Sequence, residues 1–215
     1  RRSSDLHEAI DLGIHPGYIL CADGTVVSDQ FFFEQGNREP AAVIFTEQQG
    51  EGSDCYFLAV MVKELPYLQF CDSTSMVQGT DTDINNSSAD IGKLNTTALQ
   101  NSYDSKTKHG SPLADYVFAN HNAGQSDFIP SVRELKLLYL QRDRVNSVLG
   151  RLNTLFEGSA DLLRTDLRTD SCWYWSSTEV AANPSRQAWL FSMSSGTPHE
   201  TPKLEFHAAR SIVYY

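Results

Sequence analysis

The sequence predicts an α+β fold, with antiparallel sheets and two to four helices packed to one side. Three observations favour this class. Apolar runs of strand length come first, segments with helical spacing of apolar residues follow, and period-two alternation returns near the C-terminus. Strands and helices that are segregated along the chain are typical of α+β proteins. With 215 residues and 40% hydrophobic side chains, the chain is long enough to bury a single core.

We expect an N-terminal extension over residues 1–16 and one domain over residues 17–215. The extension is polar, with a short helix predicted around Leu6–Ile10 that ends near Gly13. The chain begins at Arg1 without a methionine, so we expect it to be trimmed, and a removed export signal or lipid anchor stays open. No apolar run approaches the ~20 residues of a membrane span.

The N-terminal half predicts a hairpin and a pair of buried strands. Apolar residues 17–20 and 25–27 flank Asp23-Gly24, a dipeptide typical of hairpin turns. The continuous apolar runs 41–45 and 55–62 predict two buried antiparallel strands. Residues 69–88 are rich in Ser, Thr, Asp and Asn and predict a long surface loop.

The acidic residues of this loop region raise the question of calcium. Carboxylates that gather in one loop are potential ligands, but the glycine and distant glutamate of an EF-hand are missing. A solvated loop is the preferred interpretation, and no cofactor is expected. The carboxylates in question are Asp72, Asp81, Asp83 and Asp90.

Four helices are predicted between residues 91 and 152. Ser111 caps one that opens at Pro112, and Ser131 with Glu134 forms a capping box for the next. Apolar residues at helical spacing mark the expected core faces. In chain order these are Ile91, Leu94, Ala98 and Leu99; Leu113, Ala114, Val117 and Phe118; Val132, Leu135, Leu138 and Tyr139; and Val145, Val148, Leu149 and Leu152.

The C-terminal segment predicts a second antiparallel sheet. Residues 173–177 read as a strand, and Trp189, Phe191 and Met193 alternate with other residues at period two. Residues 194–198 predict a turn. Leu204, Phe206 and Ala208 alternate again, and residues 212–215 close the chain.

Charge and cysteine content exclude some partners. The formal net charge of −10 repels a nucleic-acid backbone and disfavours an anionic membrane surface. Solubility is the simplest reason for this acidity. The four cysteines match no zinc-site spacing. Buried free thiols are expected for them, although two disulfides remain open. They are Cys21, Cys55, Cys71 and Cys172.

Several motifs in order resemble one bacterial family. Residues 128–135 with Leu138-Tyr139 are similar to its helix-opening motif, and residues 174–179 (YWSSTE) to its most recognisable strand. Residues 188–196 and 209–213 resemble its next strand and turn and its closing strand. Residues 17–24 and 43–45 match its opening strands more loosely. The family is the C-terminal domain of collagen-like (Lcl-type) surface adhesins and their bacterial paralogues.

The resemblance implies a C-type-lectin-like fold, related to that of the formylglycine-generating enzymes. Most members of the family are regarded as binding or adhesion modules. Some relatives are hypervariable targets of diversity-generating retroelements, whose last sheet carries variable ligand-binding residues. Two departures weaken the transfer of any particular ligand. Phe128-Ile129 stands where the family often has tryptophan with tyrosine or leucine, and Arg210 stands alone where it often has two arginines.

No catalytic motif supports an enzyme. The chain has no HExxH, no Gly-x-Ser-x-Gly and no phosphate-binding glycine loop. A Ser-His-Asp set assembled in space has nothing in the sequence to favour it. A formylglycine-generating-type enzyme needs a reactive cysteine pair, and Cys172 has no neighbouring cysteine in sequence. The Glu-Pro-Asn and Trp-Asn-Asp triplets of calcium-dependent lectins are also missing, so that mode of sugar binding is disfavoured.

The exposed half of the C-terminal sheet is the candidate binding surface. Trp175 and Trp189 are expected in the core, whereas Trp173 fits either the core or a ligand contact. Glu179 fits a hydrogen-bonding role in a turn better than a ligand contact. If Trp189, Phe191, Leu204 and Phe206 point inward, the alternating polar residues share one surface. The candidate ligand-binding residues are Trp173, Arg186, Ser192, Ser194, His199, Thr201, Lys203 and Glu205.

These observations favour a non-catalytic ligand-binding or adhesion module of a bacterial cell-surface or phage protein. A glycan or a protein is the expected ligand, the expected location is extracellular or at the cell surface, and the oligomeric state stays open. Two alternatives remain: a formylglycine-generating-type enzyme, and a structural domain of a surface assembly. The last would be indicated by an exposed apolar patch of more than a few hundred Å².

Overall fold

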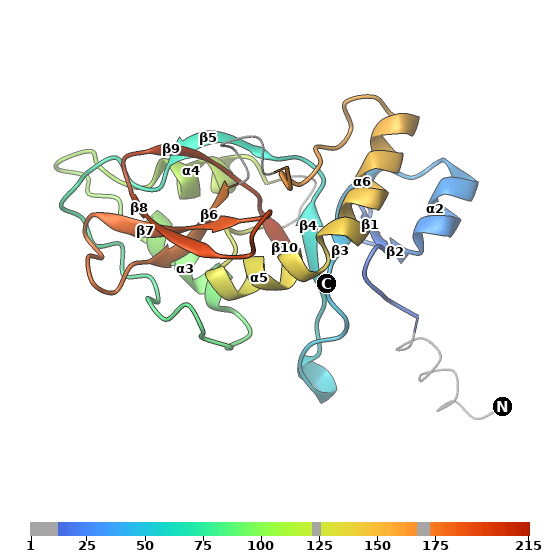
Figure 1. The fold of residues 1–215 in the computed structure, drawn as a ribbon, viewed down its shortest axis with the longest axis horizontal. Coiled ribbons are helices and arrows are strands. Elements are labelled where there is room, and N and C mark those ends of the chain that lie inside the picture. The colour runs from blue at the N-terminus through green and yellow to red at the C-terminus, as the bar shows by residue number, and fades with distance from the viewer. Residues whose placement is uncertain (1–12, 122–125, 167–172) are drawn as a thin grey trace.

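The computed structural model describes residues 13–121, 126–166 and 173–215, and it is of the α+β class (Figure 1). These ranges contain two sheets of five strands each and five α-helices. The prediction of the class is confirmed, but that of two to four helices is too low. The helix predicted around Leu6–Ile10 lies outside the described residues.

The first sheet is built from the N-terminal strands and the last strand of the chain. Its strands are β1 (Ile19–Cys21), β2 (Val26–Val27), β3 (Pro40–Ile44), β4 (Leu58–Met61) and β10 (Ile212–Tyr214). Their order is β10-β4-β3-β1-β2, and all neighbours are antiparallel. The predicted hairpin is confirmed, because the Asp23 carboxylate accepts the Thr25 amide at 3.0 Å and Gly24 adopts a φ of 86°.

The second sheet holds most of the C-terminal segment. Its strands are β5 (Leu65–Gln69), β6 (Trp173–Glu179), β7 (Gln187–Ser192), β8 (Pro198–Pro202) and β9 (Phe206–Ala209), in the order β5-β9-β6-β7-β8. The pair β6–β9 is parallel and the others are antiparallel. The sequence did not predict β5 or β8. Both lie at an edge of the sheet, where prolines such as those in β8 are tolerated and apolar alternation is weak.

Three of the five α-helices in the described ranges begin where a serine side chain accepts a first-turn amide. The α-helices are α2 (Asp29–Gln35), α3 (Ile91–Asn101), α4 (Pro112–Ala119), α5 (Val132–Leu140) and α6 (Arg142–Leu155), with a 3-10 turn at Gly52–Asp54. The predicted caps of α4 and α5 are confirmed, including both halves of the capping box formed by Ser131 and Glu134. The unpredicted α2 is capped by Ser28.

Two predicted core positions on the helices are wrong. Leu94 of α3 and Phe118 of α4 are 54% and 41% exposed. The buried face of α3 carries Asn95 and Thr96 instead. Asn95 donates to the Ser177 hydroxyl at 3.3 Å, and Thr96 donates to the Gly92 carbonyl at 2.7 Å. Because these polar groups are hydrogen-bonded, burying them costs much less free energy. Packing in the folded protein therefore decides which face of α3 is buried, in place of the apolar spacing.

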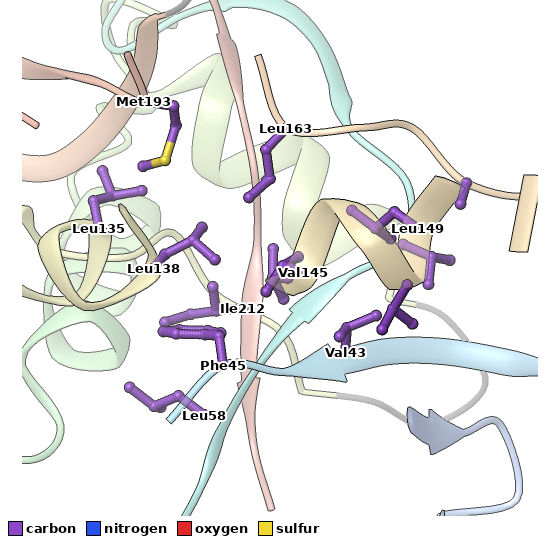
Figure 2. Packing of buried hydrophobic residues seen from close by; sticks show 14 of the residues in the cluster. Val43, Phe45, Leu58, Leu135, Leu138, Val145, Leu149, Leu163, Met193 and Ile212 are labelled. Atoms are coloured by element: carbon purple, nitrogen blue, oxygen red, sulfur yellow. The ribbon is translucent and has the colours of Figure 1, made fainter. Parts of the chain in front are cut away.

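The main core lies between the two sheets, where α5 and α6 pack (Figure 2). The predicted apolar faces of these helices are confirmed, with Tyr139 only partly buried. A second cluster lies between the second sheet and α3 and α4, and a third on the other face of the first sheet. Figure 2 shows side chains from both helices meeting the first sheet: Leu135, Leu138, Val145, Leu149, Val43, Phe45, Leu58 and Ile212.

The cysteines of the described ranges are free thiols. Cys21 and Cys71 are buried, as expected, and burial raises the pKa of each thiol. Cys55 is exposed, so the expectation of burial is wrong there, because it follows the surface 3-10 turn rather than lying inside β4. Cys172 lies outside the described residues. No group of three or more His, Cys, Asp or Glu within the described ranges is arranged to hold a metal ion.

None of the helices in the described ranges is long and apolar enough to cross a membrane. The loop between β5 and α3 is largely exposed, as predicted, but Gln78 and Thr80 within it are buried. These two residues anchor the loop to the second sheet through contacts that are described below.

The buried capping box makes stability depend on pH. Glu134 accepts the amides of Ser131 and Gly92 through Oε1, while Oε2 has no hydrogen-bond partner among the described residues. Burial raises the pKa of Glu134 above its ordinary value of 4.5. A carboxyl group whose pKa is raised on folding stabilises the fold at low pH and loses that contribution as pH rises through the folded pKa.

We therefore expect Glu134→Gln, which keeps the acceptor but never ionises, to gain stability over the wild type as pH rises above 4.5. Urea unfolding at a series of pH values measures the difference. The exposed Glu157→Gln is the matched control and should show no such trend. Parallel pH profiles for wild type and Glu134→Gln would contradict this account.

Candidate functional site

The second sheet is covered on both faces near β6 and β7. Trp175 and Leu190 belong to the cluster shared with α3 and α4, whereas Tyr174 and Phe191 belong to the cluster shared with α5 and α6. Successive residues of a strand point to opposite faces, so neither face of these strands is solvated. The prediction of a polar outer face across this sheet is therefore wrong.

Three of the candidate ligand-binding residues are consequently buried. Ser192, Thr201 and Lys203 are 1%, 6% and 1% exposed. Two residues expected to point inward are instead exposed: Phe206 at 61% and Leu204 at 36%. Residues 203–205 form a turn between β8 and β9 rather than a strand, so Leu204, Glu205 and Phe206 are all exposed and the period-two pattern does not hold there.

Lys203 forms a buried ion pair with Glu179. Its Nζ lies 2.6 Å from Glu179 Oε2, and neither side chain is exposed. The ammonium also donates to the Met76 carbonyl at 3.1 Å and to the Gln78 side chain. Burial lowers the pKa of Lys203, and the Glu179 carboxylate opposes that shift.

The Glu179 carboxylate fastens the loop before α3 to the end of β6. It accepts the Gln78 amide at 3.0 Å and the Thr80 amide at 2.7 Å. The Thr80 hydroxyl donates to it as well, at 3.0 Å. The role is one of structural hydrogen bonding, as expected, although the partners come from a loop about 100 residues away in sequence rather than from the neighbouring serines.

The tryptophans are divided between core and surface. Trp175 is fully buried and donates its indole N–H to the Leu68 carbonyl at 2.8 Å, which confirms its core position. Trp189 is partly buried against the main core, and its indole nitrogen has no partner among the described residues. Trp173 is half-buried at the start of β6. Trp173 is therefore the tryptophan whose ring meets an exposed candidate residue, His199.

Trp173 and His199 meet at the turn between β7 and β8. Their rings lie edge to face with centroids 4.2 Å apart. The Thr197 hydroxyl lies 3.4 Å from His199 Nε2, and the Ser195 hydroxyl lies 2.7 Å from the Thr197 hydroxyl. Together with Ser194, these four residues form what we call the hairpin-end cluster: Trp173, Ser194, Ser195, Thr197 and His199.

The turn is fixed by local hydrogen bonds and one glycine. The Ser192 hydroxyl accepts the amides of Ser194 and Ser195 at 3.2 and 3.1 Å. Gly196 adopts a φ of 70°, and a Cβ there would lie 2.5 Å from the Tyr139 ring. The buried Ser192 thus positions the cluster instead of facing a ligand, and the turn rests against α5.

The structure separates the remaining candidates from this cluster. Arg186 is exposed, but it directly precedes β7, whereas Ser192 is the last residue of that strand. At the usual rise per residue, the two residues lie roughly 20 Å apart. Glu205 is exposed and pairs with His207 at 2.7 Å. Ser195 and Thr197 were not among the predicted site residues. Their position on either side of Gly196, in a turn between two strands, was the signal that would have found them.

The Lys203–Glu179 pair generates a stability prediction. We expect Lys203→Met to destabilise the protein by ~3–5 kcal/mol, because Glu179 is left as a buried, uncompensated charge. Urea unfolding measures the loss, and hydrogen exchange of the Gln78 and Thr80 amides reports whether the loop is released. Lys106→Met, at an exposed position, should change stability by no more than ~0.5 kcal/mol. Equal effects of the two substitutions would refute the assignment.

Two comparisons, with protein-family models and with curated proteins, found no match to this chain. The site is therefore defined by its own geometry. It consists of aromatic rings and hydroxyl groups that lie together at one end of the second sheet.

Proposed function

We propose that the protein is a non-catalytic ligand-binding module that uses the hairpin-end cluster to engage a glycan or a protein surface. The observation that carries the proposal is the half-exposed Trp173 ring held edge to face against His199, with hydroxyl groups beside it. An aromatic ring supplies apolar contact area, while the imidazole and hydroxyls supply hydrogen bonds.

The rigidity of this surface supports binding. Trp173 is held in a strand, and His199 lies on the neighbouring edge of the same sheet, where it is paired with Leu190 across β7–β8. Groups that are already ordered lose less conformational entropy when a ligand binds. Binding sites in general place a few aromatic anchors among adaptable polar groups.

The resemblance to the Lcl-type adhesin domains extends the proposal to the fold and the location. We infer a C-type-lectin-like fold and a place on a bacterial surface or phage particle. The order of the motifs along the sequence supports this inference, as does the α+β class with two sheets. In some relatives of that family, the hypervariable targets of diversity-generating retroelements, the last sheet carries the variable ligand-binding residues, and the hairpin-end cluster belongs to the C-terminal sheet here.

One observation favours the alternative of a structural domain in a surface assembly. Leu204 and Phe206 are 36% and 61% exposed at the start of β9, and Tyr67 of the neighbouring edge strand β5 is 51% exposed. Phe206 is paired with Gln69, whose side chain donates to the Leu204 carbonyl at 2.9 Å. Exposed apolar side chains of this kind occur at protein contacts. No observation favours the formylglycine-generating-type enzyme.

The hairpin-end proposal predicts that Trp173→Ala and His199→Ala each weaken binding by about tenfold or more, since removal of an aromatic anchor typically costs over 1 kcal/mol. A glycan array together with a cell-binding assay measures the effect. Arg186→Ala is the matched control, since it removes an exposed side chain of the same sheet away from the cluster, and it should leave binding intact.

Unaltered binding by both Trp173→Ala and His199→Ala would show that the hairpin-end cluster is not the binding site. Loss of cell binding in Phe206→Ser alone would instead point to the apolar β5–β9 edge and to the structural alternative.

A further inference from the structure

A polar cavity lies between the β4–β5 connection and the C-terminal end of α4, away from the hairpin-end cluster. Its volume is about 410 Å³, within the range of roughly 300–1,000 Å³ that holds small organic ligands. Lys63 and Glu64 line one wall, Tyr116 and His121 another, and Asp127 and Ser211 complete it.

Each charged group that lines this cavity already has a partner. Lys63 Nζ lies 3.2 Å from the Asp161 carboxylate. Glu64 accepts two hydrogen bonds from Arg164 Nε, at 2.9 and 3.0 Å, and one from the Tyr174 hydroxyl at 2.8 Å.

The third charged side chain is Asp127, whose carboxylate is hydrogen-bonded to His121. Lys63 and Glu64 thus face oppositely charged groups of the protein, and the Asp127 carboxylate is already hydrogen-bonded to His121. An ionic ligand would therefore have to displace one of these partners and would still lose its hydration. The cavity therefore favours a neutral ligand.

The hydrogen-bonding groups in the cavity suit hydroxyls. His121 Nδ1 lies 2.5 Å from Asp127 Oδ1, an arrangement that fixes the orientation of the imidazole. His121 Nε2 has no hydrogen-bond partner among the described residues and is not a buried atom, so it is open to a ligand.

The Ser211 residue is 2% exposed, and its hydroxyl makes no hydrogen bond within the described part of the chain. A hydroxyl group both donates and accepts, as these lining groups require. Tyr116, 38% exposed, adds a flat apolar face.

We propose that this cavity binds a single neutral, polyhydroxylated ligand of the size of one sugar residue. His121 and Ser211 make hydrogen bonds to its hydroxyls, and the Tyr116 ring packs against its C–H face. Asp127 acts as a positioning residue, since it holds the imidazole. The site is independent of the hairpin-end cluster, so either one stands if the other fails.

A second histidine–carboxylate pair shows what a purely structural contact looks like in this protein. His109 Nδ1 lies 3.2 Å from Asp72 Oδ1, with side chains 46% and 35% exposed. The His121–Asp127 side chains are 28% and 9% exposed, and both residues line the cavity. The pair His109–Asp72 thus provides a control of matched chemistry at a solvated position.

Two NMR measurements on the whole chain test the proposal: ligand-observed spectra detect binding of each probe, and protein-observed spectra follow the histidine imidazole signals. The probes are glucose, galactose, mannose and N-acetylglucosamine, with glucosamine and glucuronic acid as charged counterparts. We expect at least one neutral sugar to bind and to shift the His121 imidazole signals. The substitutions His121→Gln and Tyr116→Ala should each weaken that binding about tenfold, whereas His109→Gln leaves it unchanged.

Three results would overturn the proposal. The first is that no neutral sugar of the panel binds. The second is that a charged analogue binds more tightly than its neutral counterpart. The third is that binding survives in both His121→Gln and Tyr116→Ala, or is lost in His109→Gln. The His121 signals of the wild type keep the test valid even where a variant fails to fold, since a titration that leaves them unmoved also contradicts the assignment.

Discussion

The burial of β6 on both faces is the constraint on which the rest of the second sheet depends. Apolar clusters cover the strand from each side, so every polar group at its end must find a partner inside the protein. Glu179 finds Lys203 and the amides of a distant loop, and Ser176 donates to the Trp189 carbonyl at 2.7 Å. The loop before α3 is therefore anchored to the strand through Gln78 and Thr80, while hydrogen bonds within the loop order residues 81–88.

The same constraint determines where a ligand can be met. With both faces covered at β6 and β7, the exposed parts of this sheet within the described ranges include its edge strands and the end where β7 turns into β8. The hairpin-end cluster and the apolar β5–β9 edge are two such places, and they differ in character. The first combines an indole with hydroxyls and an imidazole, which suits a polar partner, whereas the second offers side chains such as Phe206, which suit an apolar one.

Buried charges recur where the two sheets approach each other. Arg210 is fully buried and donates to the carbonyls of Met61 and Val62, each at 3.1 Å, so it ties the β9–β10 connection to the end of β4. Its guanidinium also lies 3.9 Å from Glu64, next to the polar cavity. Such groups contribute little net stability once desolvation is counted, but the loss of one partner is costly. They fix the relation between segments that apolar packing alone would leave variable.

The sequence by itself determined the α+β class, the Asp23-Gly24 hairpin, the caps at Ser111 and Ser131, and the core position of Trp175. These features depend on local periodicity and on hydrogen bonds between near neighbours, which a sequence displays directly. Only the tertiary structure decided that Lys203 is buried and Phe206 exposed, and that Arg186 lies apart from Trp173. Alternation shows which residues share a face, but whether that face meets water depends on segments remote in sequence that pack against it.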